Sequence, residues 1–147
     1  MTTMEKDVLI SIRPNWCEKI LSGYKTLEIR KTRPKLKTPF KCYIYQTMTG
    51  YVSKSKENDI LVPIAYGKVI GEFVCDRIQK TFDPAGGLVD VVDCKMSCVT
   101  PKEIIRYADG KALYFWHISD LKIYDTPKQL ADFGLSRPPQ SWCYLTR

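Results

Sequence analysis

The sequence predicts a small α+β domain in which five or six strands form a β-barrel and about three short helices pack around it. Its 147 residues are the usual size of one domain, and 44% hydrophobic with 27% charged residues is a globular composition. Short apolar segments also recur along the chain with helix-start signals between them. A flat open sheet of this size would leave strand edges to protect, which favours a closed or strongly curved sheet. Without a repeat or a linker, residues 1–147 are expected to form a single domain.

The first third of the chain predicts three strands and one helix. Residues 8–12 (VLISI) are short and β-branched, which is typical of a buried strand. Pro14 then begins a helix that Gly23 ends, because proline suits the first helical turn and glycine the position after the last. Residues 24–31 alternate like a strand, and residues 40–47, rich in Tyr and Ile, predict another.

The rest of the chain predicts three more strands and two helices. Residues 49–63 are polar and turn-prone, so we expect a mobile loop there. Gly71 is expected to form a bulge within its strand. The segments 100–103 (TPKE) and 126–129 (TPKQ) each place a Thr three residues before Glu or Gln, with Pro at the first helical position, which predicts a capping box. The expected strands cover residues 68–79, 112–124 and 142–145.

The net charge of +7 is concentrated in one window, residues 19–41. This window carries eight basic residues and one acidic residue, while the rest of the chain is balanced. A local cationic patch attracts polyanions such as RNA. The alternative is a solvated, lysine-rich loop that keeps the protein soluble. The basic residues are Lys19, Lys25, Arg30, Lys31, Arg33, Lys35, Lys37 and Lys41.

The six cysteines are expected to be reduced and to act as small buried hydrophobes. Residues 1–7 contain no apolar stretch of the kind found in a signal peptide, so no disulfide framework is expected. Cys94 and Cys98 are a close pair, but no second Cys/His pair follows, and His117 is the only histidine. Because structural zinc needs four ligands, we expect no metal site and no cofactor. The cysteines are Cys17, Cys42, Cys75, Cys94, Cys98 and Cys143.

No segment approaches the ~18 consecutive apolar residues that a membrane span needs. Together with the missing export signal, this predicts a soluble cytoplasmic protein that does not bind membranes. The sequence names no protein partner.

Residues 9–30 (LISIRPNWCEKILSGYKTLEIR) resemble the activating signal cointegrator homology (ASCH) domain family. That family reads, approximately, as a strand, a short helix, Gly-x-Lys and then Glu-x-Arg. The two motifs correspond here to Gly23 with Lys25 and to Glu28 with Arg30.

The resemblance covers most of the chain. Residues 67–73 (GKVIGEF) and 116–121 (WHISDL) also look like the family, and residues 48–64 match it least. The resemblance implies a PUA-like β-barrel whose cleft, beside the first helix, faces RNA or a nucleotide. Members are variously described as RNA-binding modules, ribonucleases or amidohydrolases acting on acetylated cytidine. We therefore expect an RNA- or nucleotide-binding domain, with an amidohydrolase of N4-acetylcytidine-type nucleosides or a metal-independent ribonuclease as alternatives.

The chemistry of the residues supports a ligand site at the same place. Lys25 and Arg30 would flank the cleft as phosphate partners. Tyr24 offers a ring face for an unstacked base; Trp16 offers another, unless it is core, as its apolar helix side favours. Glu28 could accept hydrogen bonds from a base, act as a general base, or pair with one of the two cations. The ligand-binding candidates are Arg13, Trp16, Lys19, Tyr24, Lys25, Thr26, Glu28 and Arg30.

If the protein is an enzyme, the candidate catalytic residues are Lys25, Glu28, Glu72 and His117. The resemblance implies that Lys25 matches the central catalytic lysine of the deacetylating branch. Partial desolvation can lower the pKa of a lysine and make it a base or nucleophile. That branch has a threonine three residues later, where this chain has Glu28, and Glu72 could supply a second carboxylate. His117 is either a general base or a structural residue of its strand.

Overall fold

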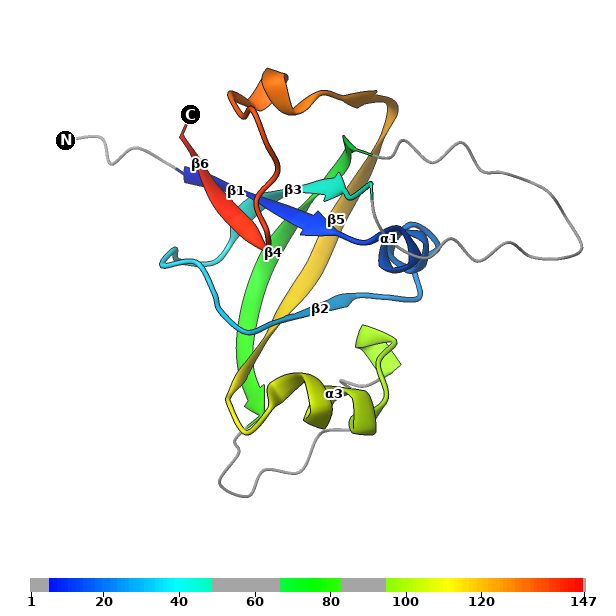
Figure 1. Ribbon diagram of the computed structural model, residues 1–147, viewed down its shortest axis with the longest axis vertical. Helices are drawn as coiled ribbons and strands as arrows, with labels where there is room; N and C mark the ends of the chain where they lie inside the picture. Colours follow the sequence, from blue (N-terminus) through cyan, green and yellow to red (C-terminus); the bar gives the residue numbers. More distant parts are fainter. Residues whose placement is uncertain (1–5, 49–66, 83–94, 147) are drawn as a thin grey trace, which may run out of the picture.

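The computed structural model describes residues 6–48, 67–82 and 95–146. The loop expected at residues 49–63 lies outside these ranges. Figure 1 labels the elements, which are, in chain order, β1 (Lys6–Ile12), α1 (Pro14–Leu21), β2 (Leu27–Arg30), β3 (Phe40–Gln46), β4 (Lys68–Phe82), α3 (Pro101–Ala108), β5 (Leu113–Lys128), the 3-10 helix η1 (Leu130–Phe133) and β6 (Trp142–Thr146).

The six strands form one sheet in the order β2-β5-β4-β3-β1-β6. β1 and β3 run parallel, and the other neighbouring strands run antiparallel. This arrangement confirms the expected α+β class with six strands and short helices. It differs from the expected barrel in one respect: in the described part of the chain, β2 and β6 are edge strands that do not pair with each other. The curved sheet is therefore not closed by backbone hydrogen bonds.

Arg30, the last residue of β2, joins the two edges of the sheet through its side chain. Its guanidinium donates to the backbone oxygen of Ser11 in β1 at 2.7 Å and to Oγ of Ser141, just before β6, at 3.0 Å. The indole N–H of Trp142 donates to Oγ1 of Thr32 at 2.9 Å and ties down the same corner. Because a guanidinium carries five donors in a planar fork, one side chain spans a gap that the backbone ladder leaves open.

β4 and β5 are the longest strands, and one sequence prediction fails on β5. Gly71 of β4 lies at a shift in register against β5, which confirms the expected bulge. A Cβ at this position would lie 2.5 Å from the backbone oxygen of Lys122, so a larger residue does not fit. The capping box predicted over 126–129 is wrong, because β5 continues to Lys128 and the cap of η1 lies at Gln129. Pairing with β4 outweighs the local helix-start signal here.

The two other expected helices are confirmed. α1 begins at Pro14, and Gly23, with a φ of +83°, follows its end. Thr100 caps α3 through the predicted box: its Oγ1 accepts the backbone N–H of Glu103 at 3.2 Å, and the Glu103 carboxylate accepts the backbone N–H of Thr100. None of the helices in the described ranges has the length and apolar character needed to cross a bilayer.

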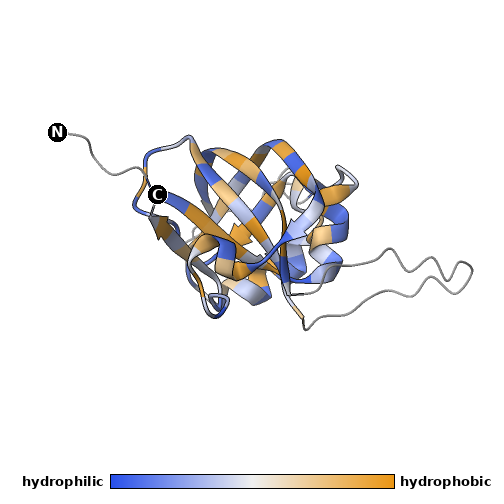
Figure 2. Ribbon diagram, turned by 90° about the horizontal axis from the view of Figure 1, so that it is seen from above, coloured by the Kyte–Doolittle hydropathy of each residue, from blue (hydrophilic) through white to orange (hydrophobic). Residues whose placement is uncertain are grey.

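Apolar and polar residues alternate along the strands (Figure 2), and the apolar ones gather in three buried clusters. The largest joins α1 to the sheet around Trp116, which is fully buried and meets Phe40 edge-on at 6.0 Å. The second holds α3 against β2 and β5 through residues such as Ile104 and Leu27. The third, around Leu9, lies on the opposite face of β1 from the largest, because neighbouring strand residues point to opposite faces.

Three of the cysteines are buried, as predicted, and all those in the described ranges are free thiols. Burial raises the pKa of each buried thiol, which keeps it protonated and inert. Cys94 lies outside the described residues. The buried cysteines are Cys17, Cys42 and Cys75, and the half-buried ones are Cys98 and Cys143.

Candidate functional site

Lys25 differs most from its expected place. The sequence predicts a phosphate partner at the side of a cleft, but only 2% of the residue is exposed. Its ammonium donates to the backbone oxygen of Ser97 at 2.6 Å, lies 3.7 Å from Oε1 of Glu28, and sits 4.8 Å from the centre of the Trp16 ring. Burial lowers the pKa of Lys25, and the charge of Glu28 opposes that shift. Lys25 is therefore an internal charge of the site and not a surface phosphate contact.

Glu28 is a buried carboxylate with one unsatisfied oxygen. It lies in β2, opposite Trp116 of β5, and is 6% exposed. Oε1 accepts the backbone N–H of Ile29 at 3.1 Å and faces Lys25. Oε2 lies 3.5 Å from a guanidinium nitrogen of Arg30, but among the described residues it has no hydrogen-bond partner. Because buried polar atoms almost always have a partner, this oxygen marks a position for a donor.

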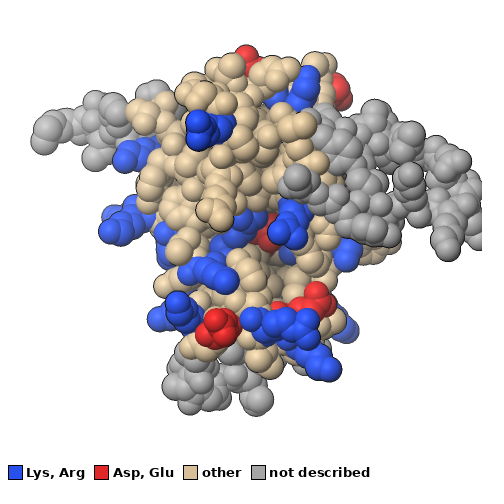
Figure 3. All heavy atoms as spheres, in the orientation of Figure 1, with Lys and Arg blue, Asp and Glu red and all other residues tan. Residues whose placement is uncertain are grey.

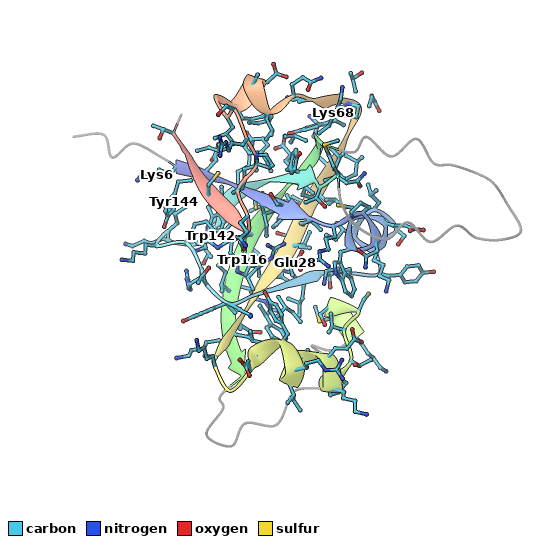
Figure 4. The ribbon with its side chains drawn as sticks, in the orientation of Figure 1. Lys6, Glu28, Lys68, Trp116, Trp142 and Tyr144 are labelled. Carbon is cyan, nitrogen blue, oxygen red and sulfur yellow. The ribbon has the colours of Figure 1, made fainter. Side chains whose placement is uncertain are left out.

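Glu28 lies near the middle of one face of the molecule, where β2 passes between α1 and α3 (Figure 4). Figure 3, in the same orientation, shows acidic atoms at this place, in a hollow of the surface with Lys and Arg atoms beside them. The Glu28 side chain is 8% exposed, so a small part of it reaches this face, while Oε2 itself is buried just beneath the surface.

Trp16 covers the lysine. It is half-buried and packs against the largest core cluster, as its position on the helix predicts. The ammonium groups of Lys19 and Lys25 each lie 4.8 Å from the centre of its ring. Two cations on one indole ring are attracted by its negative face, so Trp16 shields Lys25 from solvent and helps to hold its charge.

The remaining ligand-binding candidates lie at the two ends of α1 and in the segment that follows it. Tyr24 is 76% exposed, which leaves its ring available to a ligand. Arg13 and Lys19 are exposed at the two ends of the helix. Thr26 is half-buried, and its backbone N–H donates to the oxygen of Met96 at 2.7 Å, so the segment before α3 runs beside the start of β2.

His117 lies on the other face of the β2–β5 pair from Glu28. In this pair, Leu27 is opposite His117 while Glu28 is opposite Trp116, and directly opposed side chains share a face. Nδ1 of His117 is paired with the carboxylate of Asp76 in β4. The histidine therefore does not join the lysine–carboxylate pair, and its contact with Asp76 is separate from it.

Glu72 is also separate from the site. Its carboxylate accepts the hydroxyl of Tyr124 at 2.8 Å and lies 3.1 Å from the ammonium of Lys41. Of the four candidate catalytic residues, only Lys25 and Glu28 come together. Within the described ranges, no three His, Cys, Asp or Glu side chains gather as metal ligands would.

The basic window of residues 19–41 does not form one face. Lys25 is buried, Arg30 joins the edges of the sheet, and Arg33 donates to backbone oxygens of its own loop. Lys41 pairs with the carboxylate of Glu72, which lies outside this window of the sequence. The cations of the window that remain exposed are Lys19, Lys31, Lys35 and Lys37.

Tyr107 of α3 lies near the site, although the sequence analysis does not single it out. It is 40% exposed, and the ammonium of Lys31 lies 4.7 Å from the centre of its ring. Partial burial raises the pKa of Tyr107, and the charges of Arg30 and Glu28 also act on it. The contact with Lys31 places the Tyr107 ring next to the end of β2. No sequence signal predicts this contact, because it arises from the packing of α3 against β2.

The structure resembles solved structures of ASCH proteins from Zymomonas mobilis. The ASCH protein itself matches with a TM-score of 0.68 and 20% identity, over 96% of this chain and 88% of that chain. Two mutants of it, one serine-to-alanine and one tyrosine-to-phenylalanine, match with TM-scores of 0.70 and 0.71, each at 20% identity. These matches cover 96% and 97% of this chain, and 89% and 92% of the mutant chains. The chain has the ASCH fold.

The ASCH fold confirms the resemblance that residues 9–30 predict. At 20% identity the likeness establishes the fold alone. No family model and no curated protein matches the chain. The activity must therefore be argued from the site.

Proposed function

We propose that this ASCH-fold chain binds RNA or a free nucleotide, and that Glu28 accepts a hydrogen bond from the base. The observation that carries the proposal is the buried oxygen Oε2 of Glu28, which has no hydrogen-bond partner among the described residues. Leaving a buried polar atom unpaired costs about 1–3 kcal/mol. The amino or imino groups of a nucleobase are donors of the required kind.

The surroundings of this oxygen support the same class of ligand. Tyr24, at 76% exposed, presents a ring on which a base can stack. Arg13, just before α1, and Lys19, in its last turn, are both exposed and can contact phosphates. Lys25 keeps positive charge beside Glu28 while it remains buried and bonded to Ser97.

Calorimetry with the four ribonucleoside monophosphates and a mixed-sequence single-stranded RNA tests this proposal. Glu28→Gln removes the charge while keeping the shape, and we expect it to weaken binding ~10-fold or more, the scale of a hydrogen bond to a charged group. Glu72→Gln is the matched control, because Glu72 is a strand carboxylate in the separate Lys41 pair. Absence of binding up to millimolar ligand, or equal binding by wild type and Glu28→Gln, contradicts the proposal.

A second candidate function is hydrolysis of an N4-acetylated cytidine, and the lowered pKa of Lys25 favours it. Burial, which causes that shift, makes the ammonium a better proton donor, and it lies 3.7 Å from a carboxylate oxygen of Glu28. In this reaction a water molecule attacks the acetyl carbonyl carbon while the Glu28 carboxylate takes a proton from that water. Lys25 then gives a proton to the departing N4 nitrogen, and the products are acetate and cytidine.

Incubation of the protein with N4-acetylcytidine and RNA, followed by mass analysis of the products, tests the second candidate. If the protein is an amidohydrolase, Lys25→Arg should lower turnover by ~10² or more, because arginine does not release its proton below pH ~12. If the wild-type protein releases no cytidine from N4-acetylcytidine, the hydrolase candidate is wrong. Shortened RNA in the same experiment would indicate the ribonuclease alternative.

A further inference from the structure

The surface between α3 and the end of β2 contains a groove that the proposed function does not use. It is open, has a volume of about 500 Å³, and is lined by Lys31, Glu103, Arg106, Tyr107 and Asp109. This volume is within the roughly 300–1,000 Å³ that is typical of small-ligand sites, although a nucleotide in so open a groove would be covered on one side only.

The packing of α3 directs these side chains outward. Ile104 and Ala108 of the helix are buried against β2 and β5 in the second core cluster. Arg106 and Tyr107 therefore lie on the other side of the helix, where both are exposed. Figure 1 shows α3 alongside β2, on the side of the strand away from α1.

The groove adjoins the candidate site. Lys31 directly follows Arg30, whose guanidinium lies 3.5 Å from Oε2 of Glu28. The ammonium of Lys31 lies 4.7 Å from the centre of the Tyr107 ring. A ligand at Glu28 that extends past Arg30 therefore reaches Lys31 and the ring of Tyr107.

We propose that this groove is a second subsite, which takes the nucleotide adjacent to the one at Glu28, so that the partner is single-stranded RNA and not a free nucleotide. The inference rests on the proposed function of the Glu28 site. The exposed ring of Tyr107 offers a stacking surface for the second base, and Lys31 and Arg106 offer charges for its phosphate.

The charges in the groove fit a base with one phosphate better than a purely anionic ligand. The two cations are accompanied by two carboxylates. Glu103 accepts from the backbone N–H and the hydroxyl of Thr100, so the helix start already uses it. Among the described residues, Lys31 has the Tyr107 ring as its contact and lies within 4 Å of no carboxylate. Its ammonium can leave the ring for a phosphate when a base stacks in its place.

The test compares the affinity of the four ribonucleoside monophosphates with that of a mixed-sequence RNA tetranucleotide. The wild type should bind the tetranucleotide at least ~10-fold more tightly than the best monophosphate, because stacking adds to the contacts at Glu28. Tyr107→Leu should weaken tetranucleotide binding about 5- to 100-fold and leave monophosphate binding unchanged. Tyr107→Phe keeps the ring and should behave as the wild type.

Replacing the two exposed cations of the groove gives a second test, which does not depend on the packing of Tyr107. Lys31→Gln with Arg106→Gln should lower the log–log salt slope of tetranucleotide binding by about 0.7 for each phosphate that the variant no longer neutralises. Lys102→Gln is the matched control, because Lys102 is exposed on α3 but does not line the groove.

The outcomes separate the two proposals. If monophosphates bind at Glu28 but the tetranucleotide binds no more tightly, the second subsite is overturned and the proposed function stands. Tetranucleotide binding that neither Tyr107→Leu nor the double cation variant changes also overturns the subsite. If neither ligand binds, both proposals fail together.

Discussion

Two lysine–carboxylate pairs in this protein show how differently the same two residue types can be used. In the Lys25–Glu28 pair the side chains are 1% and 8% exposed, and in the Lys41–Glu72 pair they are 37% and 19% exposed. Glu72 has a partner for each oxygen, Tyr124 for one and Lys41 for the other. Glu28 is more deeply buried and yet has an oxygen without a hydrogen bond in the described structure.

The difference indicates which pair is a structural contact and which is a candidate site. A pair near the surface whose polar atoms all have partners contributes little to the free energy of unfolding and needs no further hydrogen-bond partner. A buried, incompletely satisfied pair costs free energy, and proteins break such local rules mainly at functional sites. The pKa shifts follow the same division: burial lowers the pKa of Lys25, whereas the hydrogen bond that Lys41 donates to Glu72 raises the pKa of Lys41.

The largest expected effect is that of Lys25→Met. The substitution leaves the buried Glu28 carboxylate without its lysine, and breaking a buried pair costs about 3–5 kcal/mol of the free energy of unfolding. Urea unfolding followed by far-UV circular dichroism measures the loss. A change below ~1 kcal/mol would mean that the two charges are effectively solvated, and the contrast with the Lys41 pair would disappear.

Replacing both members of the buried pair should reverse most of that loss. Lys25→Met combined with Glu28→Met removes both buried charges, and an apolar replacement of similar volume is often neutral or stabilising. We expect the double variant to recover at least ~2 kcal/mol relative to Lys25→Met, while nucleotide binding is abolished. A double variant that is stable and still binds ligand would show that Glu28 is not part of the site.

The two lysines should also respond oppositely to alkaline pH. The folded-state pKa of Lys25 is below its unfolded value of 10.5, so the unfolded chain binds more protons and this group's contribution to stability rises with pH up to about that value. The folded-state pKa of Lys41 is above 10.5, so its contribution is complete below 10.5 and is lost as pH rises through the folded value. In unfolding measurements between pH 7 and 11, the wild type's advantage over Lys25→Met should therefore grow and its advantage over Lys41→Met should shrink. Parallel pH profiles for the two variants would contradict this expectation.

The smallest effect belongs to the surface pair. Lys41→Met should cost ~1 kcal/mol or less, because the Lys41 side chain is 37% exposed and solvent screens its attraction to Glu72. The same urea titration gives the value. A loss as large as that of Lys25→Met would show that the two pairs contribute equally to stability, and the distinction between them would be wrong.

The predictions that succeed on this chain are the local ones. Pro14 at the start of α1, the capping box at Thr100 and the bulge at Gly71 all depend on residues within a few positions of each other. The capping box at Thr126 fails for the complementary reason, because pairing between β4 and β5 competes with it from outside the local sequence.

The candidate site is predictable only in part for the same physical reason. The resemblance of residues 9–30 picks out Lys25 and Glu28, and the structure brings them together. It does not show that Lys25 is buried, because the backbone oxygen that holds its ammonium belongs to Ser97, 72 residues away. His117 and Glu72 have suitable chemistry, but strand pairing gives them other partners. His117 meets Asp76 across β5 and β4, and Glu72 meets Lys41 across β4 and β3.

What the sequence by itself determined is the type and order of most elements, because apolar periodicity and helix caps act between near neighbours. Only the tertiary structure decided which charges are buried and what they meet. The curvature of the sheet brings Arg30 of one edge strand to Ser11 and Ser141 beside the other. The docking of α3 brings the Tyr107 ring to Lys31, just after the end of β2. These contacts join residues far apart in the chain, and burial, which lowers the pKa of Lys25, exists only once they form.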